Sequence, residues 1–171
     1  MPTDILHPVQ TPVEQLLHEC EVQHTRRRGP GGQHRNKTES AVVLSHTPTG
    51  VGGQASERRS QFDNLRVAVK RLRINLALEV RTEALADAAP TELWQSRCHE
   101  GRIACNPDHD DFAPLLAEAL DVLHSRNGHV AGSATQLGVT ASQLIKFIKH
   151  EPRALLLLNE ERRQRGLHPL E

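Results

Sequence analysis

The sequence predicts an α+β fold, in which a short β-sheet with one long helix is followed by a small all-α domain of the helix-turn-helix type. Two runs rich in alternating or β-branched residues predict strands at Cys20–Thr25 and Ala41–His46. Between residues 56 and 78, apolar side chains recur at helical spacing, which predicts a long helix. Beyond residue 108, helical patterns alternate with turn residues. A chain of 171 residues can hold two small domains of this kind.

We expect four segments along the chain: a leader at 1–10, an α+β domain at 11–81, a linker at 82–107 and a helical domain at 108–171. Thr11-Pro12 is typical of a helix start, with Thr11 as the N-cap. Ala41–His46 ends in a turn that contains Pro48 and Gly50, so a hairpin return along 51–55 should follow.

The long helix should bury one apolar face and expose a basic one. Its apolar positions recur at intervals of three and four residues, and we expect all of them to face the core: Phe62, Leu65, Val69, Leu72 and Leu76. Arg and Lys occupy much of the remaining surface. Such a face is either simply solvated or in contact with nucleic acid.

The C-terminal half predicts three further features. The linker should contain a short helix around Trp94, and a convincing helix follows from about 111 to 125. Residues 130–150 resemble a helix-turn-helix, with Leu137-Gly138-Val139-Thr140 as the turn. Its second helix is too apolar for an exposed DNA-reading helix, so packing or docking is the favoured role. A last helix should cover about 153–166.

Composition limits the classes of function. Lys and Arg total 21, as do Asp and Glu, but residues 1–81 hold 12 basic and 8 acidic side chains. The basic front half favours a nucleic-acid-facing surface. With four aromatic residues and no Tyr, we expect phosphate contacts rather than base stacking. Three cysteines give no disulfide framework, and the N-terminus lacks a signal-peptide pattern, so we expect a cytoplasmic protein without a membrane segment.

The stretch from Arg26 to Lys37 is the most informative in the chain. It contains three glycines, one proline and five Arg or Lys residues, with no acid. Glycines let a backbone approach a ligand closely and expose its N–H groups, and flanking arginines suit phosphate binding. The alternative is an ordinary mobile, basic surface turn.

The residues that follow this stretch decide between those alternatives. Gly29-Pro30-Gly31-Gly32-Gln33-His34 is followed in register by Asn36-Lys37, Glu39-Ser40-Ala41-Val42, His46, Pro48-Thr49-Gly50 and Arg59-Ser60-Gln61 with Asn64. Over about residues 20–78, this pattern resembles the peptidyl-tRNA hydrolysis domain of class I peptide chain release factors. A second Gly-Gly-Gln, at Gly52–Gln54, lacks the basic flanks and is interpreted as a coincidence.

The resemblance implies a codon-independent peptidyl-tRNA hydrolase that acts on the ribosome in termination or rescue. Gly31, Gly32 and Gln33 are then the catalytic residues: the Gln33 backbone N–H stabilises the oxyanion and its side chain shapes the water site. The partners implied are the ribosome and the P-site peptidyl-tRNA, and a methyltransferase that modifies Gln33 is a further candidate. The residues expected to contact rRNA or tRNA are Arg26, Arg27, Arg28, His34, Arg35, Asn36, Lys37, Arg58, Arg59, Ser60, Gln61, Lys70 and Arg71.

Two departures from the family pattern stand beside the tripeptide. Arg28 replaces a small residue and Arg35 an apolar one, which adds bulk and charge. Because only 30 residues precede Gly31, we expect no codon-recognition domain, and we expect none of the basic tail usual in short rescue hydrolases. Two other interpretations remain: a non-catalytic rRNA- or DNA-binding protein, and a hydrolase that needs a codon-sensing partner.

No cofactor or metal is expected, and the protein should be a monomer. Cys98, His99, Cys105 and His109 offer four potential metal ligands, but they lack the closely spaced cysteine pair typical of structural zinc sites.

Overall fold

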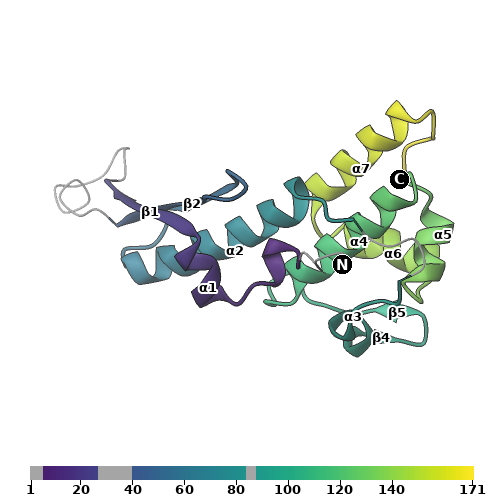
Figure 1. The fold of residues 1–171 in the computed structure, drawn as a ribbon, viewed down its shortest axis with the longest axis horizontal. Helices are drawn as coiled ribbons and strands as arrows, with labels where there is room; N and C mark the ends of the chain where they lie inside the picture. Colours follow the sequence, from purple (N-terminus) through teal and green to yellow (C-terminus); the bar gives the residue numbers. More distant parts are fainter. Residues whose placement is uncertain (1–5, 27–39, 84–87) are drawn as a thin grey trace, which may run out of the picture. The chain divides into compact units, whose positions relative to one another are not determined.

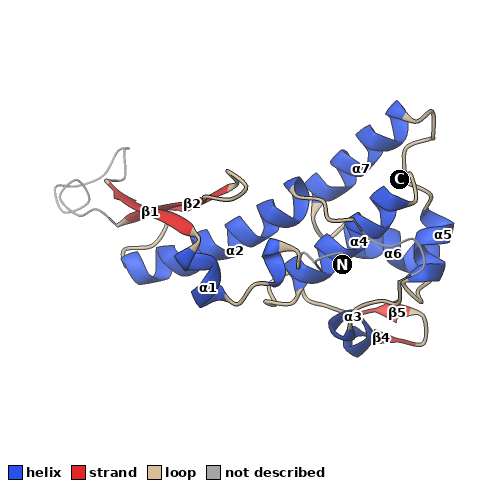
Figure 2. Ribbon diagram, in the orientation of Figure 1, coloured by secondary structure: helices blue, strands red, loops and turns tan. Residues whose placement is uncertain are grey.

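The computed structural model describes residues 6–26, 40–83 and 88–171 (Figure 1). Helices and strands are both present, which confirms the α+β class (Figure 2). The chain forms two compact units: Pro8–Glu79, called here the sheet unit, and Met1–His7 with Val80–Glu171, called the helical unit. Within the described part of the chain, no helix has both the length and the apolar composition needed to cross a bilayer.

The sheet unit contains a three-stranded antiparallel sheet covered by one long helix. The strand order is β1-β2-β3, with Thr25 paired to Ala41 across the first two strands and Val42 to Ala55 across the second pair. Central strand β2 is mostly buried, whereas β1 is exposed after its first residue. The elements are η1 (Pro8–Gln10), α1 (Val13–His18), β1 (Cys20–Thr25), β2 (Ala41–His46), β3 (Gly52–Ala55) and α2 (Gln61–Glu79).

Close contact between β3 and α2 explains the second Gly-Gly-Gln. A Cβ atom on Gly53 would lie 2.5 Å from the carbonyl oxygen of Ala68 and 2.6 Å from the backbone nitrogen of Leu72. Only glycine lets the strand approach the helix backbone this closely. Gly52–Gln54 is therefore a packing feature of the sheet unit.

The start of α2 corrects two expectations. The helix begins at Gln61 rather than near residue 56, and Phe62 in its first turn is 68% exposed instead of buried. The buried face of α2 includes Ala68 and Leu72, which meet β3. At 3.6 residues per turn, Phe62 lies within about 40° of the buried Val69 and Leu76 around the helix, so its exposure follows from its place in the first turn rather than from its rotation.

The N-terminal helix also begins later than expected. Helix α1 starts at Val13, with Pro12 at the N-cap position and no side-chain cap, so Thr11 does not cap it.

The helical unit is built around three aromatic side chains. Trp94 and Phe147 meet edge to face with ring centroids 5.8 Å apart, and Phe112 contacts the same Phe147 ring at 5.4 Å. All three are buried. The elements of this unit are α3 (Glu92–Arg97), β4 (Cys98–His99), β5 (Arg102–Ile103), α4 (Phe112–Ser125), α5 (Val130–Gln136), α6 (Ala141–Ile148) and α7 (Pro152–Gln164).

The segment expected to be a linker differs from that expectation in its described residues, 82–83 and 88–107. Trp94 in α3 is fully buried, and its indole N–H donates to the Leu137 carbonyl oxygen at 2.8 Å. A side chain of this size anchors the segment in the helical unit. The expected leader differs too: His7 and Val9 are buried, and the His7 Nε2–H donates to the Val80 carbonyl oxygen at 3.3 Å.

Helices α5 and α6 form the helix-turn-helix that the sequence predicts. Gly138 adopts a left-handed φ of 66° in the turn, and the Thr140 side chain accepts a hydrogen bond from the Gln143 backbone N–H at the start of α6. Ala134 and Leu144 are buried. Local chemistry thus sets this motif: glycine reverses the chain and threonine caps the next helix.

Candidate functional site

Most of the predicted catalytic stretch lies outside the described residues. This applies to Gly31, Gly32 and Gln33, and to six predicted RNA-contacting residues: Arg27, Arg28, His34, Arg35, Asn36 and Lys37. The two ends of the stretch are described. Thr25 at the end of β1 pairs with Ala41 at the start of β2, and exposed Arg26 follows Thr25. The antiparallel ladder therefore holds both ends of the stretch side by side.

A buried amide fixes the C-terminal end of the stretch to α2. The Asn64 side-chain NH₂ donates to the carbonyl oxygens of Ser40 (2.6 Å) and Arg58 (2.9 Å). Its Oδ1 accepts from the Arg58 backbone N–H at 2.9 Å. Asn64 is fully buried, so losing these bonds would leave polar groups unsatisfied. Asn64 belongs to the family pattern but is not among the predicted site residues; an asparagine on the buried face of a helix is the signal that indicates this role.

The predicted contacts at 58–61 stand where the chain enters α2. Arg58, Arg59 and Gln61 are exposed. The Ser60 Oγ accepts a hydrogen bond from the Asp63 backbone N–H at 3.3 Å, as an N-cap does. The structure therefore gives Ser60 a role in starting the helix. The side chains of Arg58 and Arg59 are exposed, next to the backbone that Asn64 holds in place.

Lys70 and Arg71, predicted together as RNA contacts, leave α2 in different directions. The Arg71 Nη1 donates to the Gln54 carbonyl oxygen at 2.8 Å, and its Nη2 pairs with the Glu57 carboxylate. The hydrogen bond from Arg71 lowers the pKa of Glu57 to about 2. Arg71 thus joins α2 to β3 within the unit, whereas the exposed Lys70 is about 100° away around the helix.

A second polar cluster braces the β2–β3 turn. The His46 Nε2–H donates to Glu19 Oε2 at 3.2 Å, and its Nδ1 accepts from the Thr49 hydroxyl at 2.7 Å. A hydroxyl, an imidazole and a carboxylate in a row resemble the catalytic triad of a hydrolase. Here, however, His46 is only 1% exposed and Thr49 Oγ1 also accepts from the Val51 backbone N–H, so the three groups do not face a substrate site. These bonds fix the turn, a role that the sequence pattern did not reveal.

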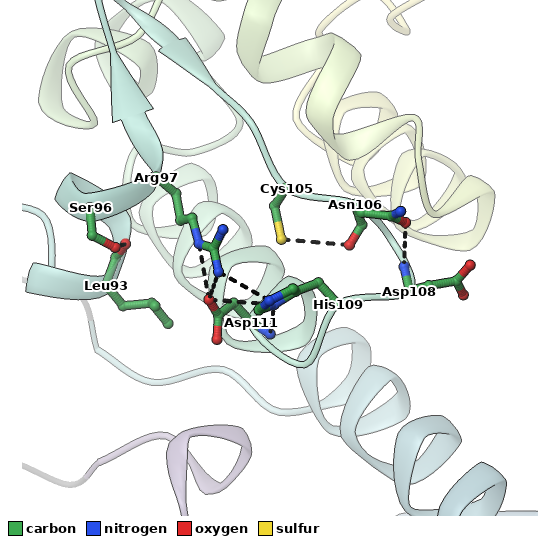
Figure 3. Close-up of polar contacts among 8 residues, drawn as sticks. All are labelled: Leu93, Ser96, Arg97, Cys105, Asn106, Asp108, His109 and Asp111. Atoms are coloured by element: carbon green, nitrogen blue, oxygen red, sulfur yellow. Dashed lines mark hydrogen bonds and ion pairs between the residues drawn. The ribbon is translucent and has the colours of Figure 1, made fainter.

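In the helical unit, two of the four potential metal ligands, Cys105 and His109, are engaged with other groups (Figure 3). The Arg97 Nη2 lies 2.5 Å from Asp111 Oδ2 and 3.2 Å from His109 Nε2. A guanidinium this close to the imidazole opposes binding of a metal cation there. Burial raises the pKa of the Cys105 thiol, which disfavours the thiolate that metals bind. Among the described residues, no three His, Cys, Asp or Glu side chains are grouped for a metal.

The second helix of the helix-turn-helix has a buried and a basic face. Leu144, Phe147 and Ile148 are buried, whereas Lys146 and Lys149 are exposed. Most of its apolar surface thus serves the core of the helical unit, as the sequence suggested.

Comparison with known proteins places these features in a family. A family model described as the RF-1 domain matches residues 11–103, which include the sheet unit from Thr11 onward. This chain belongs to the RF-1 domain family. The release-factor resemblance drawn from the sequence is therefore confirmed.

Individual relatives match a shorter part of this RF-1 domain chain. Peptide chain release factor 1 of Mycoplasma pneumoniae is 45% identical over 64 residues, and that of Acidiphilium cryptum is 48% identical over 64 residues. Each match covers 37% of the chain and 18% of the relative. Peptide chain release factor 2 of Variovorax paradoxus is 57% identical over 51 residues, covering 30% of the chain and 14% of the relative. The match thus spans less than a fifth of each of these relatives.

Proposed function

We propose that this RF-1 domain protein hydrolyses the ester bond of peptidyl-tRNA on the ribosome. The observation that carries the proposal is the intact Gly31-Gly32-Gln33, set among basic residues inside the family match. The described geometry supports it, since the ladder and Asn64 fix both ends of the stretch that carries the tripeptide. A catalytic loop needs fixed ends to present its backbone reproducibly.

The chemistry follows from what ester hydrolysis requires. Water attacks the ester carbonyl, its proton passes to solvent or to the tRNA leaving group, and the ester C–O bond then breaks. Charge builds on the carbonyl oxygen in between and needs a preorganised donor. We assign that donor to the Gln33 backbone N–H and the shaping of the water site to the Gln33 side chain. Arg26, Arg58 and Arg59 supply positive charge for RNA phosphates.

We further propose that release is independent of the A-site codon. This part is supported by the helical unit, which continues beyond the end of the family match at residue 103. The exposed Lys146 and Lys149 of this unit offer a docking surface on the ribosome. Methylation of Gln33 belongs to the same proposal.

The test is peptide release from purified ribosomes that carry peptidyl-tRNA in the P site, with the A site empty or filled by each of several codons. Gln33→Ala should abolish release and leave ribosome binding nearly intact. The chain offers a matched control: Gln54→Ala makes the same substitution at the exposed glutamine of the second Gly-Gly-Gln and should release normally. Gln33→Pro removes the backbone N–H and should also abolish release.

Each outcome discriminates between interpretations. Release by the wild type that is equal for all codons supports a rescue-type hydrolase, whereas codon-dependent release contradicts the independence proposed here. Undiminished release by Gln33→Ala contradicts the mechanism. No release by any variant, with binding retained, favours a nucleic-acid-binding role or a requirement for a partner protein.

A further inference from the structure

One aromatic side chain is placed differently from the others. The chain has four aromatic residues, and Trp94, Phe112 and Phe147 form the buried cluster of the helical unit. The fourth, Phe62, is 68% exposed in the first turn of α2. A ring this exposed loses the stabilisation that burial would provide and leaves its face open to a ligand.

The neighbours of Phe62 on the outer surface of α2 are basic. Arg66 follows four residues later and Lys70 four after that, and all three side chains are exposed. Residues four apart lie on the same side of a helix, about 6 Å apart along its axis. Arg59, just before the helix, is exposed as well. Asp63 is the nearest acid in the sequence and is rotated by about 100° from Phe62.

We propose that Phe62 and Arg66 form a binding site for an unpaired nucleotide of RNA, with the base stacked on the Phe62 ring and a neighbouring phosphate held by Arg66. A flat apolar ring beside guanidinium groups matches the two parts of a nucleotide, a base with a π-face and a charged phosphate. Charge complementarity selects RNA over an apolar protein partner. The site extends the proposed function, because it gives the ribosome-facing side of α2 a contact that distinguishes unpaired from paired RNA.

The experiment measures binding of the full chain to a labelled single-stranded oligoadenylate and to a double-stranded RNA of the same length, across a salt series. Phe62→Ala should weaken single-strand binding by roughly tenfold and leave double-strand binding unchanged, because only an unpaired base can stack. Its salt dependence should equal that of the wild type. Arg66→Ala should instead reduce the salt slope by about 0.7, the value for one phosphate contact on a single strand.

Matched variants separate stacking from general apolar contact and from misfolding. Phe62→Trp should bind as the wild type does or more tightly, and Phe62→Leu should resemble Phe62→Ala. Leu156→Ala removes another large exposed side chain, 66% exposed on α7, and should change nothing. Wild-type binding by Phe62→Leu, or an equal loss on double-stranded RNA, overturns the proposal. So does weaker ribosome binding by Phe62→Ala without any change on the oligonucleotide, which would indicate a ribosomal protein as the partner.

This test is separable from that of the proposed function. If Gln33→Ala leaves release unchanged, the hydrolase mechanism fails, but a loss of single-strand affinity in Phe62→Ala still supports the nucleotide site. Conversely, normal oligonucleotide binding by Phe62→Ala rules out the nucleotide site, and the conclusion from the release assay is unaffected.

Discussion

The two units of the chain are held together in different ways. The helical unit has a core of large rings, in which Phe147 contacts both Trp94 and Phe112. The apolar side chains that the described sheet unit buries are all aliphatic, and polar side chains fix its backbone: Asn64 to Ser40, and Arg73 to the Val9 carbonyl oxygen at 3.1 Å. A thin sheet covered by one helix buries little surface, so specific hydrogen bonds must define its turns and loop ends.

The two units should therefore be sensitive to different kinds of mutation. In the helical unit, loss of ring volume should cost stability. In the sheet unit, loss of a single amide should cost positional accuracy at the ends of the proposed catalytic stretch, with a smaller effect on stability.

The largest expected effect is that of Trp94→Ala. It empties a fully buried site and removes the hydrogen bond to Leu137, so the free energy of unfolding of the helical unit should fall by about 3–5 kcal/mol. Hydrogen exchange read by mass spectrometry on the full chain should show lost protection in α3–α6 and unchanged protection in β2 and α2. Equal loss in both units would contradict the division described here.

An intermediate effect is expected for Asn64→Ala, which leaves the Ser40 carbonyl and both Arg58 backbone groups without their bonds to this side chain. The cost to stability should be about 1–3 kcal/mol, and peptide release should fall further than the fraction of folded protein explains. Asn75→Ala is the matched control, since the Asn75 amide donates to the Gly52 carbonyl oxygen at 2.7 Å, away from Ser40. If both variants release equally well when folded, Asn64 has only a structural role.

The smallest expected effect is a pH dependence of the helical unit. Burial lowers the pKa of His7 below its ordinary 6.5, so the unfolded chain binds a proton that the folded chain excludes. Stability should therefore be fully present above about pH 6.5 and fall as the pH drops from there toward the folded pKa, by at most about 1.4 kcal/mol per pH unit. Urea midpoints at about pH 7.5 and pH 5.5 should differ less in His7→Gln than in the wild type.

Asp121 lies near Arg81 in the same unit, and its titration changes stability in the opposite direction to that of His7. The Asp121 carboxylate accepts from the Thr82 hydroxyl at 2.5 Å and lies 3.6 Å from Arg81, yet burial raises its pKa above the ordinary 3.8. A raised carboxyl pKa lowers stability as the pH rises from 3.8 through the folded pKa, the reverse of the His7 effect. A midpoint difference that is the same in wild type and His7→Gln would rule out His7 as the group responsible.

The sequence predicted best where structure depends on near neighbours. The strand bounds at Cys20–Thr25 and Ala41–His46 agree with the structure, and the turn at Gly138 and Thr140 needs only local chemistry. The exposure of Phe62 was missed, because a helical pattern does not reveal where the covering sheet ends.

Contacts between distant residues were beyond the sequence analysis. Trp94 is anchored by a carbonyl 43 residues further on, so a segment with the composition of a linker becomes part of a core. Asn64 reaches Ser40 across 24 residues, which no spacing rule indicates. For the candidate site, the basic residues are a prediction from the sequence, whereas the separation of Arg71 from Lys70 is visible only in the fold.

The connection between His7 and Val80 has a consequence for the modular construction of the protein. The chain leaves the helical unit after His7 and returns to it at Val80, and the hydrogen bond between these residues holds the two crossing points together. In sequence, the sheet unit is thus a cassette inserted into another domain, and domains with adjacent ends tolerate excision, exchange and permutation. We therefore expect the helical unit to fold when a short bridge from residue 7 to residue 80 replaces the sheet unit, and to accept a different insert at the same pair of points.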